Sequence, residues 1–519
     1  MTWVTARWSC WWWSADTDLS EADVRNRIVP RSLPPGEASQ TFDEVESTFS
    51  PEEAIAEARR VLAAGFDLRI ARMACPFKVD LDGFIRRIAD GDPDGALEII
   101  RRSHPFASVF GRMCHRWCEL QTPPLDEPGV MSLARYPEFD RRPDAPRPRI
   151  DRPAFPDLER FAGDYGDPAR SPVLPEKPPS GKRVAVVGGG SAGLGGAWML
   201  RRLGHEVDIY DMLHVPGGTL FSGYPPFRMA KFGVRRDNDP AAWGARFFGG
   251  VHVTREMFER IVNDYDFTLA TIGIHHPYMV GIDGEDADGV WNALDFIAAV
   301  SMGTAPANVR RALIIGAGGT ARDACRTARR LGAEVTVCYR RSFELLELGR
   351  DPNILGIIGS EGVQFLCLVQ PTRVLSNGDG RVTGVEFLRT ELGPPEENPV
   401  AVPIDGTEFV VECDTVVEAI GEGAGLGMFP PSIALKNGHV VVDRADHRTS
   451  HPKVFAAGEL IGDNGNDTAA LGAMQAAFTM DSILRDEPLV LFDSRPFARL
   501  YTRRKTPPPS QFPWATPVR

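Results

Sequence analysis

Apolar and polar positions follow two different patterns along the chain. Between residues 51 and 136 apolar residues recur at helical spacing, as in PEEAIAEARRVLAAG and LDGFIRRIADGDPDGALEIIRRSHPF, where GDPDG separates two helices. After residue 181 the pattern becomes a short apolar run, a glycine-rich turn, a helix and a second apolar run. We therefore expect a small helical domain followed by α/β domains.

The second pattern, an apolar run, a glycine-rich turn, a helix and another apolar run, occurs twice. KRVAVVGGGSAGLGGAWMLRRLGHEVDIYD begins at residue 182, and RRALIIGAGGTARDACRTARRLGAEVTVCYRR begins at residue 310. Each is a strand, a tight turn, a helix and a strand, the opening of a doubly wound sheet. The fold class is therefore predicted as α/β with two Rossmann-like dinucleotide-binding domains.

Composition shifts divide the chain into segments. The first 50 residues are polar and predicted to be disordered, and the Pro- and Arg-rich residues 137–181 are predicted to be an extended linker. The expected segments are 1–50, 51–136 (helical), 137–181, 182–300 (first α/β unit), 301–421 (second unit), 422–485 (return to the first unit) and a tail at 486–519.

Composition indicates which binding partners and which cellular compartment to expect for this protein. The 519 residues are 25% charged with a formal net charge of −12, which argues against a nucleic-acid or anionic-membrane partner. Eight irregularly spaced cysteines do not form a disulfide framework, so we expect a cytoplasmic location. The Trp-rich start lacks the apolar region of a signal peptide, and no apolar run reaches the roughly 18 residues of a membrane span.

The first unit carries a G-x-G-x-x-G turn after its strand at 184–187. Gly188 permits the tight turn, Gly190 lets the backbone approach a pyrophosphate, and Gly193 allows close packing of helix and strand. Asp211 ends the second strand, 18 residues after Gly193, where a carboxylate accepts from a ribose hydroxyl. The alternative is a glycine-rich turn without a ligand, which the strand, helix and acid at these spacings disfavour.

The second unit differs at two points. Its turn is Gly316-x-Gly318-x-x-Ala321, with alanine in the third position, and its second strand ends in Arg340 and Arg341 instead of an acid. Two arginines suit a 2′-phosphate through paired hydrogen bonds and charge, which favours NADP(H) over NAD(H). The alternative is an arginine pair that is merely solvated at a strand end.

An acid-ended and an arginine-ended site in one chain predict a flavin in the first unit and NADPH in the second. Apolar strands that end in glycine, LATIGIHHP (269–277) and VVEAIG (416–421), suit a chain that crosses between the two domains. A third segment (451–478) places Gly458 and Glu459 before a helix, within reach of flavin oxygens. Hydride transfer depends on positioning rather than on a proton donor, so no catalytic acid or base is assigned.

With these pieces in order, the chain resembles the glutamate synthase small-subunit family, which includes the NADPH-entry halves of dihydropyrimidine dehydrogenases. The likeness covers residues 51–484, and GGTLFSGYPPFRMAK matches a flavin segment of the family at Gly217, Gly218 and Leu220. The resemblance implies an FAD domain split by an NADP domain, preceded by a helical domain of iron–sulfur type that passes electrons to a redox partner protein or subunit. The candidate cofactor-binding residues are Gly188, Gly190, Ser191, Ala192, Gly193, Asp211, Gly217, Gly218, Leu220, Thr271, Gly273, Gly316, Gly318, Thr320, Ala321, Arg340, Arg341, Gly421, Gly458 and Glu459.

The chain departs from the family where iron–sulfur clusters are bound. Cysteine positions of one cluster are occupied by Val61, Ala64 and Thr122, and no cysteine occurs between residues 65 and 74, so that cluster is expected to be absent. The family's non-cysteine ligand of the other cluster, an acid or amide, aligns with Ala134.

The second cluster keeps three cysteines, Cys75, Cys114 and Cys118. They are packing residues, ligands of one iron–sulfur cluster with an unusual fourth ligand, or a different metal or redox site. The sequence leaves these three alternatives open.

The leading hypothesis is an NADPH-dependent FAD oxidoreductase that passes electrons to a partner protein or a small acceptor. The absence of any C-x-x-C disfavours thioredoxin-type disulfide chemistry, and His275 and His276 are expected to be surface loop residues. A non-catalytic cofactor-binding scaffold and a true glutamate synthase small subunit are the alternatives. Intact phosphate turns count against the first alternative, and missing cluster ligands count against the second.

Overall fold

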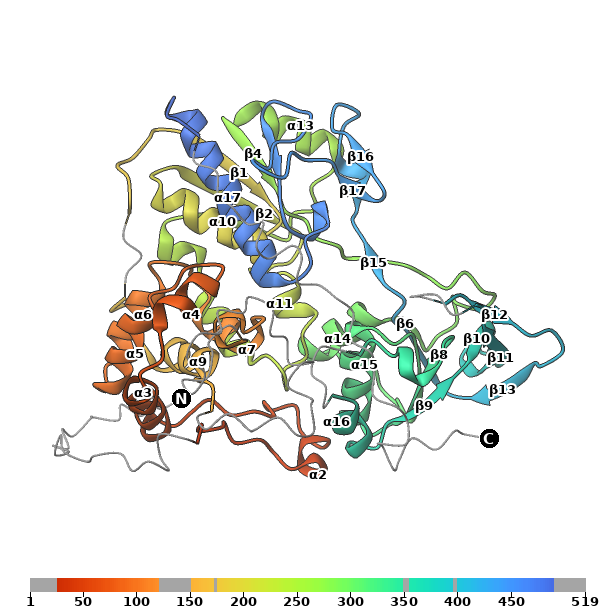
Figure 1. Cartoon of the computed structure of the whole chain (residues 1–519). Helices are drawn as coiled ribbons and strands as arrows, with labels where there is room; N and C mark the ends of the chain where they lie inside the picture. Colours follow the sequence, from red (N-terminus) through yellow and green to blue (C-terminus); the bar gives the residue numbers. More distant parts are fainter. Residues whose placement is uncertain (1–25, 121–150, 172–174, 349–353, 395–398, 490–519) are drawn as a thin grey trace, which may run out of the picture.

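The computed structural model describes residues 26–120, 151–171, 175–348, 354–394 and 399–489. Three bodies are visible in Figure 1: a helical domain in red and orange, an α/β domain in yellow, lime and blue above it, and a second α/β domain in green and teal beside it. None of the described helices is both long enough and apolar enough to span a membrane.

The helical domain is built around α3 (Pro51–Ala64), α5 (Leu81–Ala89), α6 (Pro93–Ile100), α7 (Ala107–Met113) and α9 (Phe155–Tyr165). α3 starts with a complete capping box, in which the Ser50 side chain accepts from the Glu53 backbone and the Glu53 side chain accepts from the Ser50 backbone. The buried faces of these helices share one hydrophobic core.

Two predicted segments differ from the structure. Helix α9 lies inside residues 137–181, where an extended linker was expected, and it is buried along most of its length. Residues 26–50 were expected to be disordered, but they include a short helix, α2 (Pro35–Ala38), and a bridge between Ser32 and Glu46. Both segments gain their order from contacts with distant parts of the chain, which a local pattern does not contain.

The first α/β domain has a parallel five-stranded sheet in the order β18-β4-β1-β2-β3. Its strands are β1 (Arg183–Val187), β2 (Glu206–Asp211), β3 (Arg246–Gly249), β4 (Phe267–Ala270) and β18 (Val454–Ala456). Helix α10 (Ser191–Arg202) packs against the C-terminal helix α17 (Asn466–Leu484), and the carbonyl and methyl groups of α17 lie where side chains at Gly195 and Gly196 would stand. The sheet therefore combines β1–β4 with β18, and the second α/β domain is inserted between these strands in the sequence.

The second α/β domain has a parallel sheet in the order β6-β14-β7-β8-β9. Its strands are β6 (Val290–Asn292), β7 (Arg311–Ile315), β8 (Glu334–Tyr339), β9 (Gln364–Cys367) and β14 (Thr415–Glu418). β6 and the following helix α14 (Ala293–Ser301) belong to this domain, so it begins before the expected boundary at residue 301.

The second domain also carries a small antiparallel sheet. It consists of β10 (Val369–Ser376), β11 (Val382–Leu392), β12 (Ala401–Pro403) and β13 (Phe409–Glu412). The chain passes between the two α/β domains through the paired strands β5 (His276–Pro277) and β15 (Glu422–Gly423).

The turn after β1 is held tightly against the end of β4. Gly188 has φ +105°, and its Cβ would collide with the Thr271 carbonyl. A Cβ at Gly193 would collide with the Gly188 carbonyl, while the Thr271 hydroxyl donates to that same oxygen at 2.8 Å. In the second domain Ala321 occupies the position of Gly193 and is fully buried. The second turn therefore has space for a methyl group at this position, and the first turn does not.

Gly193→Ala is expected to lower the thermal unfolding temperature by about 5–10 °C, because the added methyl group has no space against the Gly188 carbonyl. The matched change in the other unit, Ala321→Gly, should lower it by only about 2–4 °C through lost packing and helix propensity. Calorimetry of both variants measures the difference, and equal effects would contradict the packing described here.

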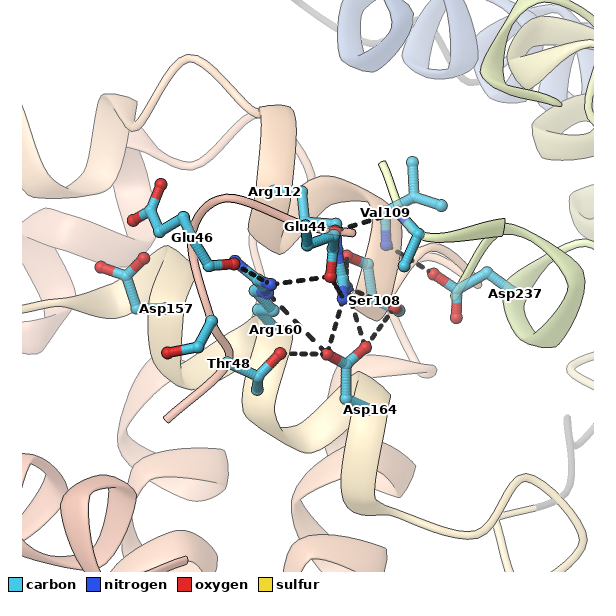
Figure 2. A network of polar contacts seen from close by, with 12 residues as sticks. Glu44, Glu46, Thr48, Ser108, Val109, Arg112, Asp157, Arg160, Asp164 and Asp237 are labelled. Atoms are coloured by element: carbon cyan, nitrogen blue, oxygen red, sulfur yellow. Dashed lines mark hydrogen bonds and ion pairs between the residues drawn. The ribbon is translucent and has the colours of Figure 1, made fainter. Parts of the chain in front are cut away.

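A buried polar network joins the N-terminal segment, the helical domain and the first α/β domain (Figure 2). The Arg112 guanidinium donates to both Glu44 oxygens at 2.6 and 2.8 Å and to both Asp164 oxygens at 2.8 Å. Glu44 also accepts from the Ala230 backbone at 2.9 Å, and Asp237 accepts from the Val109 backbone at 2.8 Å. One guanidinium thus connects three segments that are distant in sequence.

Arg112→Ala should destabilise the protein by about 3–5 kcal/mol, because two largely buried carboxylates lose their main cationic partner. Arg102→Ala is the control, since Arg102 pairs with Glu98 on the exposed surface and such pairs contribute below about 1 kcal/mol. Urea unfolding of both variants measures the two effects. A loss for Arg112→Ala no larger than that of the control would show that the network is not structural.

Candidate cofactor-binding sites

The glycine turn after β1 (188–193) and the glycine pair Gly217–Gly218 lie against each other, and together they are called the cradle. Gly217 donates its N–H to the Gly189 carbonyl at 2.9 Å, and a Cβ at Gly218 would lie 2.8 Å from Gly190 Cα. The turn of β1 and residues 217–218 therefore approach each other backbone to backbone, leaving N–H groups and the N-terminus of α10 for a diphosphate. Gly188, Gly190, Gly217 and Gly218 had all been predicted to bind the same cofactor.

Asp211 lies directly beside this cradle. One of its carboxylate oxygens accepts from Gly189 N–H at 2.5 Å and the other from Leu213 N–H at 2.7 Å. Burial raises the pKa of Asp211, although these two N–H donors act in the opposite direction. The carboxylate is placed at the end of β2, as a ribose hydroxyl would require.

A polar chain that the sequence did not indicate borders the cradle. The Ser191 hydroxyl donates to the Asn466 side-chain oxygen at 2.9 Å, and the Asn466 amide donates to the Tyr224 hydroxyl at 3.0 Å. Asn466 is the first residue of α17, and Tyr224 follows the Gly217–Gly218 segment. Both residues lie in segments assigned to the flavin, but neither was singled out, and only the three-dimensional arrangement reveals this chain.

The loop that carries Gly217, Gly218 and Leu220 is anchored on both sides. Leu220 is completely buried in the core of the first domain. Arg228 forms an ion pair with Asp323 of helix α15 (Gly319–Arg330) in the second domain. The loop therefore connects the two cofactor sites.

The second turn is more open than the first. Gly316 has φ +117° and donates to the Cys338 carbonyl at 2.9 Å, whereas Gly318 has open space where a side chain would project. Arg340, just after β8, is exposed, and Arg341 donates to the Tyr339 hydroxyl at 3.5 Å. This surface is accessible and cationic, which suits a phosphorylated nucleotide.

The crossing strands bring carboxyl groups between the two turns. Burial raises the pKa of Glu422, in β15, and the Thr320 side chain of the second turn acts in the opposite direction. Glu459 Oε2 lies 4.0 Å from the position that a Cβ of Gly273 would take, so it faces the end of β4. Burial, followed by the charges of Glu422 and Asp463, raises the pKa of Glu459 to about 7.

The remaining predicted residues lie in the same two places. Thr271 and Gly273 follow β4, Gly421 precedes β15 with φ +116°, and the Cβ of Ala192 lies 3.0 Å from the position of a Gly458 Cβ. His276 is exposed, and the His275 ring contacts the Ile272 carbonyl at 3.1 Å.

The cysteines lie in the helical domain. Cys75 and Cys114 are the C-cap residues of α4 (Leu68–Ala74) and α7, and Cys118 lies in α8 (Trp117–Leu120). Burial raises the pKa of all three thiols, that of Cys75 to about 11. Among the described residues, no group of three or more His, Cys, Asp or Glu could hold a metal ion.

The altered cluster positions fall partly outside the described chain. Val61 and Ala64 are buried in the core of the helical domain, where they pack as ordinary apolar residues. Thr122 and Ala134 lie outside the described residues.

Two family models match the chain. Residues 182–478 match the pyridine nucleotide-disulphide oxidoreductase model, and residues 38–123 match dihydropyrimidine dehydrogenase domain II, 4Fe-4S cluster. The second match covers the helical domain that carries the three cysteines.

Curated relatives agree with these matches. The chain is 32% identical to the NADP(+)-dependent formate dehydrogenase subunit beta of Moorella thermoacetica over 79% of this chain and 59% of that protein. It is 32% identical to the NADPH-Fe(3+) oxidoreductase subunit beta of Geobacter sulfurreducens over 70% of this chain and 52% of that protein. It thus spans only about half to three-fifths of these two relatives.

A third relative is matched along almost its whole length. The glutamate synthase [NADPH] small chain of Halomonas elongata is 28% identical over 90% of this chain and 98% of that protein. The resemblance expected from the motifs is thereby confirmed. The chain belongs to the pyridine nucleotide-disulphide oxidoreductase family.

Proposed function

We propose that this chain oxidises NADPH at the second α/β domain and passes the electrons through FAD in the first to a partner protein or a small acceptor. The main support is a pair of similar glycine turns, one in each α/β domain, in domains that are connected by β5 and β15. In the first domain Asp211 ends β2, and in the second Arg340–Arg341 follows β8. Bound FAD would supply the hydride-accepting ring, which no side chain can provide.

The protein's own contribution is positioning and exclusion of water. The backbone N–H groups at the two turns hold phosphates, the Gly217–Gly218 segment covers the first turn, and the ion pair between Arg228 and Asp323 fixes the second turn relative to it. These contacts support an oxidoreductase rather than a scaffold, because a scaffold does not need two nucleotide sites held at a fixed position relative to each other.

The partner is the least defined part of this proposal. Two relatives are named as beta subunits, and this supports a partner subunit for the present chain. The glutamate synthase small-chain alternative is supported by the match along the length of that relative. A cytoplasmic location remains the prediction from cysteine usage.

The test is an anaerobic visible spectrum of the purified protein before and after addition of NADPH. Bound flavin that bleaches with NADPH, and more slowly with NADH, is expected. A protein that takes up FAD but is not reduced by either nucleotide would leave the scaffold alternative.

Arg340→Ala combined with Arg341→Ala should raise the KM for NADPH about 10- to 100-fold and leave the KM for NADH within about twofold, because only the 2′-phosphate contacts are removed. Steady-state reduction of an artificial acceptor measures both constants. The control is Arg373→Ala, an exposed arginine on β10 paired with Glu386. Equal losses for the two nucleotides would contradict the assigned role.

Glu459 introduces a dependence of stability on pH. Because its pKa is raised to about 7, its contribution to stability is complete below the ordinary carboxyl pKa and is lost as the pH rises through 7. Glu459→Gln should therefore reduce the loss of thermal stability between pH 5 and 8, by on the order of 1–3 kcal/mol. The control is Glu256→Gln in the first turn of α13 (Arg255–Asp264), and the unfolding temperature is measured across this pH range. Parallel pH curves for wild type and Glu459→Gln would refute the assignment.

A further inference from the structure

A tyrosine occupies the place where the two α/β domains meet. Tyr224 follows α11 (Thr219–Ser222), a short helix directly after the Gly217–Gly218 pair that contacts α14 of the second domain (Figure 1). The Tyr224 ring packs against the core of the first domain. Charges from both sides act on its hydroxyl, since Glu459 lies beside the first turn and Asp323 lies in α15. The hydroxyl therefore lies between the two nucleotide sites.

Both the backbone and the ring of Tyr224 are held by cationic side chains. Lys231 Nζ donates to the Phe221 carbonyl at 2.6 Å and to the Tyr224 carbonyl at 2.5 Å, which fixes the backbone at this point. The Arg228 guanidinium lies 5.2 Å from the centre of the Tyr224 ring and pairs with Asp323 of the second domain. The position of the ring is therefore determined by contacts from both domains.

The polar chain from Ser191 to Tyr224 has a defined direction. Ser191 donates to the Asn466 side-chain oxygen, so the amide nitrogen of Asn466 is the group that faces Tyr224. The Tyr224 oxygen accepts from this nitrogen at 3.0 Å, and an amide NH2 group cannot accept in return. The hydroxyl proton of Tyr224 has no acceptor among the described residues. The chain therefore ends in a hydrogen-bond donor that the protein itself does not use.

This donor is available throughout the neutral pH range. Burial raises the pKa of Tyr224, and the positive charges of Arg228 and Arg322 act in the opposite direction without reversing the shift. The hydroxyl therefore stays protonated. An O–H group that is removed from bulk water without an acceptor is unfavourable, and an acceptor on a bound molecule removes this cost. A tyrosine that only filled space would not need an amide group fixed toward its oxygen.

We propose that the Tyr224 hydroxyl donates a hydrogen bond to the ring of the bound flavin, and that Asn466 and Ser191 are its positioning residues. The chain starts at the cradle, because Ser191 is the first residue of α10 and Asn466 is the first residue of α17. A Cβ at Gly218 would lie 2.8 Å from Gly190 Cα, so the cradle has no space for a further side chain that could accept the proton. Oxygen and nitrogen atoms of a flavin ring can accept it.

A donor at this position favours the reduced flavin. Reduction adds electron density to the oxygen and nitrogen atoms of the ring, and a hydrogen bond becomes stronger as its acceptor becomes more negative. Hydrogen bonds to the ring are one of the means by which a protein tunes a flavin. Tyr224 should therefore raise the reduction potential of the flavin, and removal of its hydroxyl should lower it.

The experiment is anaerobic redox equilibration of the FAD-containing full chain with a reference dye of known potential, together with the visible spectrum of the oxidised protein. Tyr224→Phe should shift the equilibrium about 3- to 10-fold toward oxidised flavin, which is about 15–30 mV for a two-electron couple, and should move the flavin absorption bands. Asn466→Ala should shift the equilibrium in the same direction by a smaller factor, because the Tyr224 hydroxyl is then no longer held in place.

Tyr165→Phe is the matched control, because it removes the same hydroxyl group from a tyrosine of α9 that is 44% exposed. It should match wild type in potential and spectrum. A Tyr224→Phe protein with the potential and spectrum of wild type would overturn the inference, and so would changes that occur only after NADP+ is added. An FAD content and an unfolding temperature equal to those of wild type exclude misfolding as the cause of a shift.

This inference rests on the proposed function for the presence of the flavin. The two can fail separately. A wild-type protein that takes up no FAD would refute the proposed function itself. A wild-type protein that contains FAD and is bleached by NADPH, with an unchanged potential in Tyr224→Phe, would refute only the role of Tyr224.

Discussion

The contact between the turn of β1 and the end of β4 determines where the chemistry of this protein can take place. Gly188, Gly193 and Thr271 meet with no space for an additional carbon atom, and this brings the N-terminus of α10 directly above the sheet. The Gly217–Gly218 segment then closes over the turn through one backbone hydrogen bond. The second domain repeats the arrangement with Gly316 against the Ala419 carbonyl. Both nucleotide sites therefore depend on the absence of side chains at a few backbone approaches.

A second constraint connects the helical domain to this core. Arg112 holds Glu44 and Asp164 together, while Glu44 also binds the backbone of Ala230 in the loop that follows the glycine pair. His115, next to Cys114, contacts Asp467 in the first turn of α17. The cysteine-bearing helices are thus fixed relative to the helix that borders the flavin cradle.

The sequence predicted the parts of the fold that depend on local chemistry. Glycines in the turns, the acid at the end of β2 and the arginines after β8 are specified by conformational freedom and charge, which are visible in a single strand–turn–helix unit. Helix α9 and residues 26–50 were missed because their order comes from burial against segments that are distant in the sequence, as in the packing of α9 on α7 and the pairing of Arg27 with Asp157. Asn466 and Tyr224 were missed for the same reason, since no spacing rule relates residues that meet only after folding.

The two nucleotide sites differ in exposure as well as in charge, and this difference has a physical consequence. Asp211 is 8% exposed and lies beside the turn that the Gly217–Gly218 segment approaches, so the flavin site of the proposed function is enclosed. Arg340 is exposed, and the space beside Gly318 is open, so a nucleotide there can leave after each turnover. A cationic, accessible site accelerates the arrival of an anionic substrate, whereas a buried carboxylate would slow it. Under the proposed function, the enclosed turn suits a permanently bound cofactor, and the accessible turn suits a substrate that exchanges after each turnover.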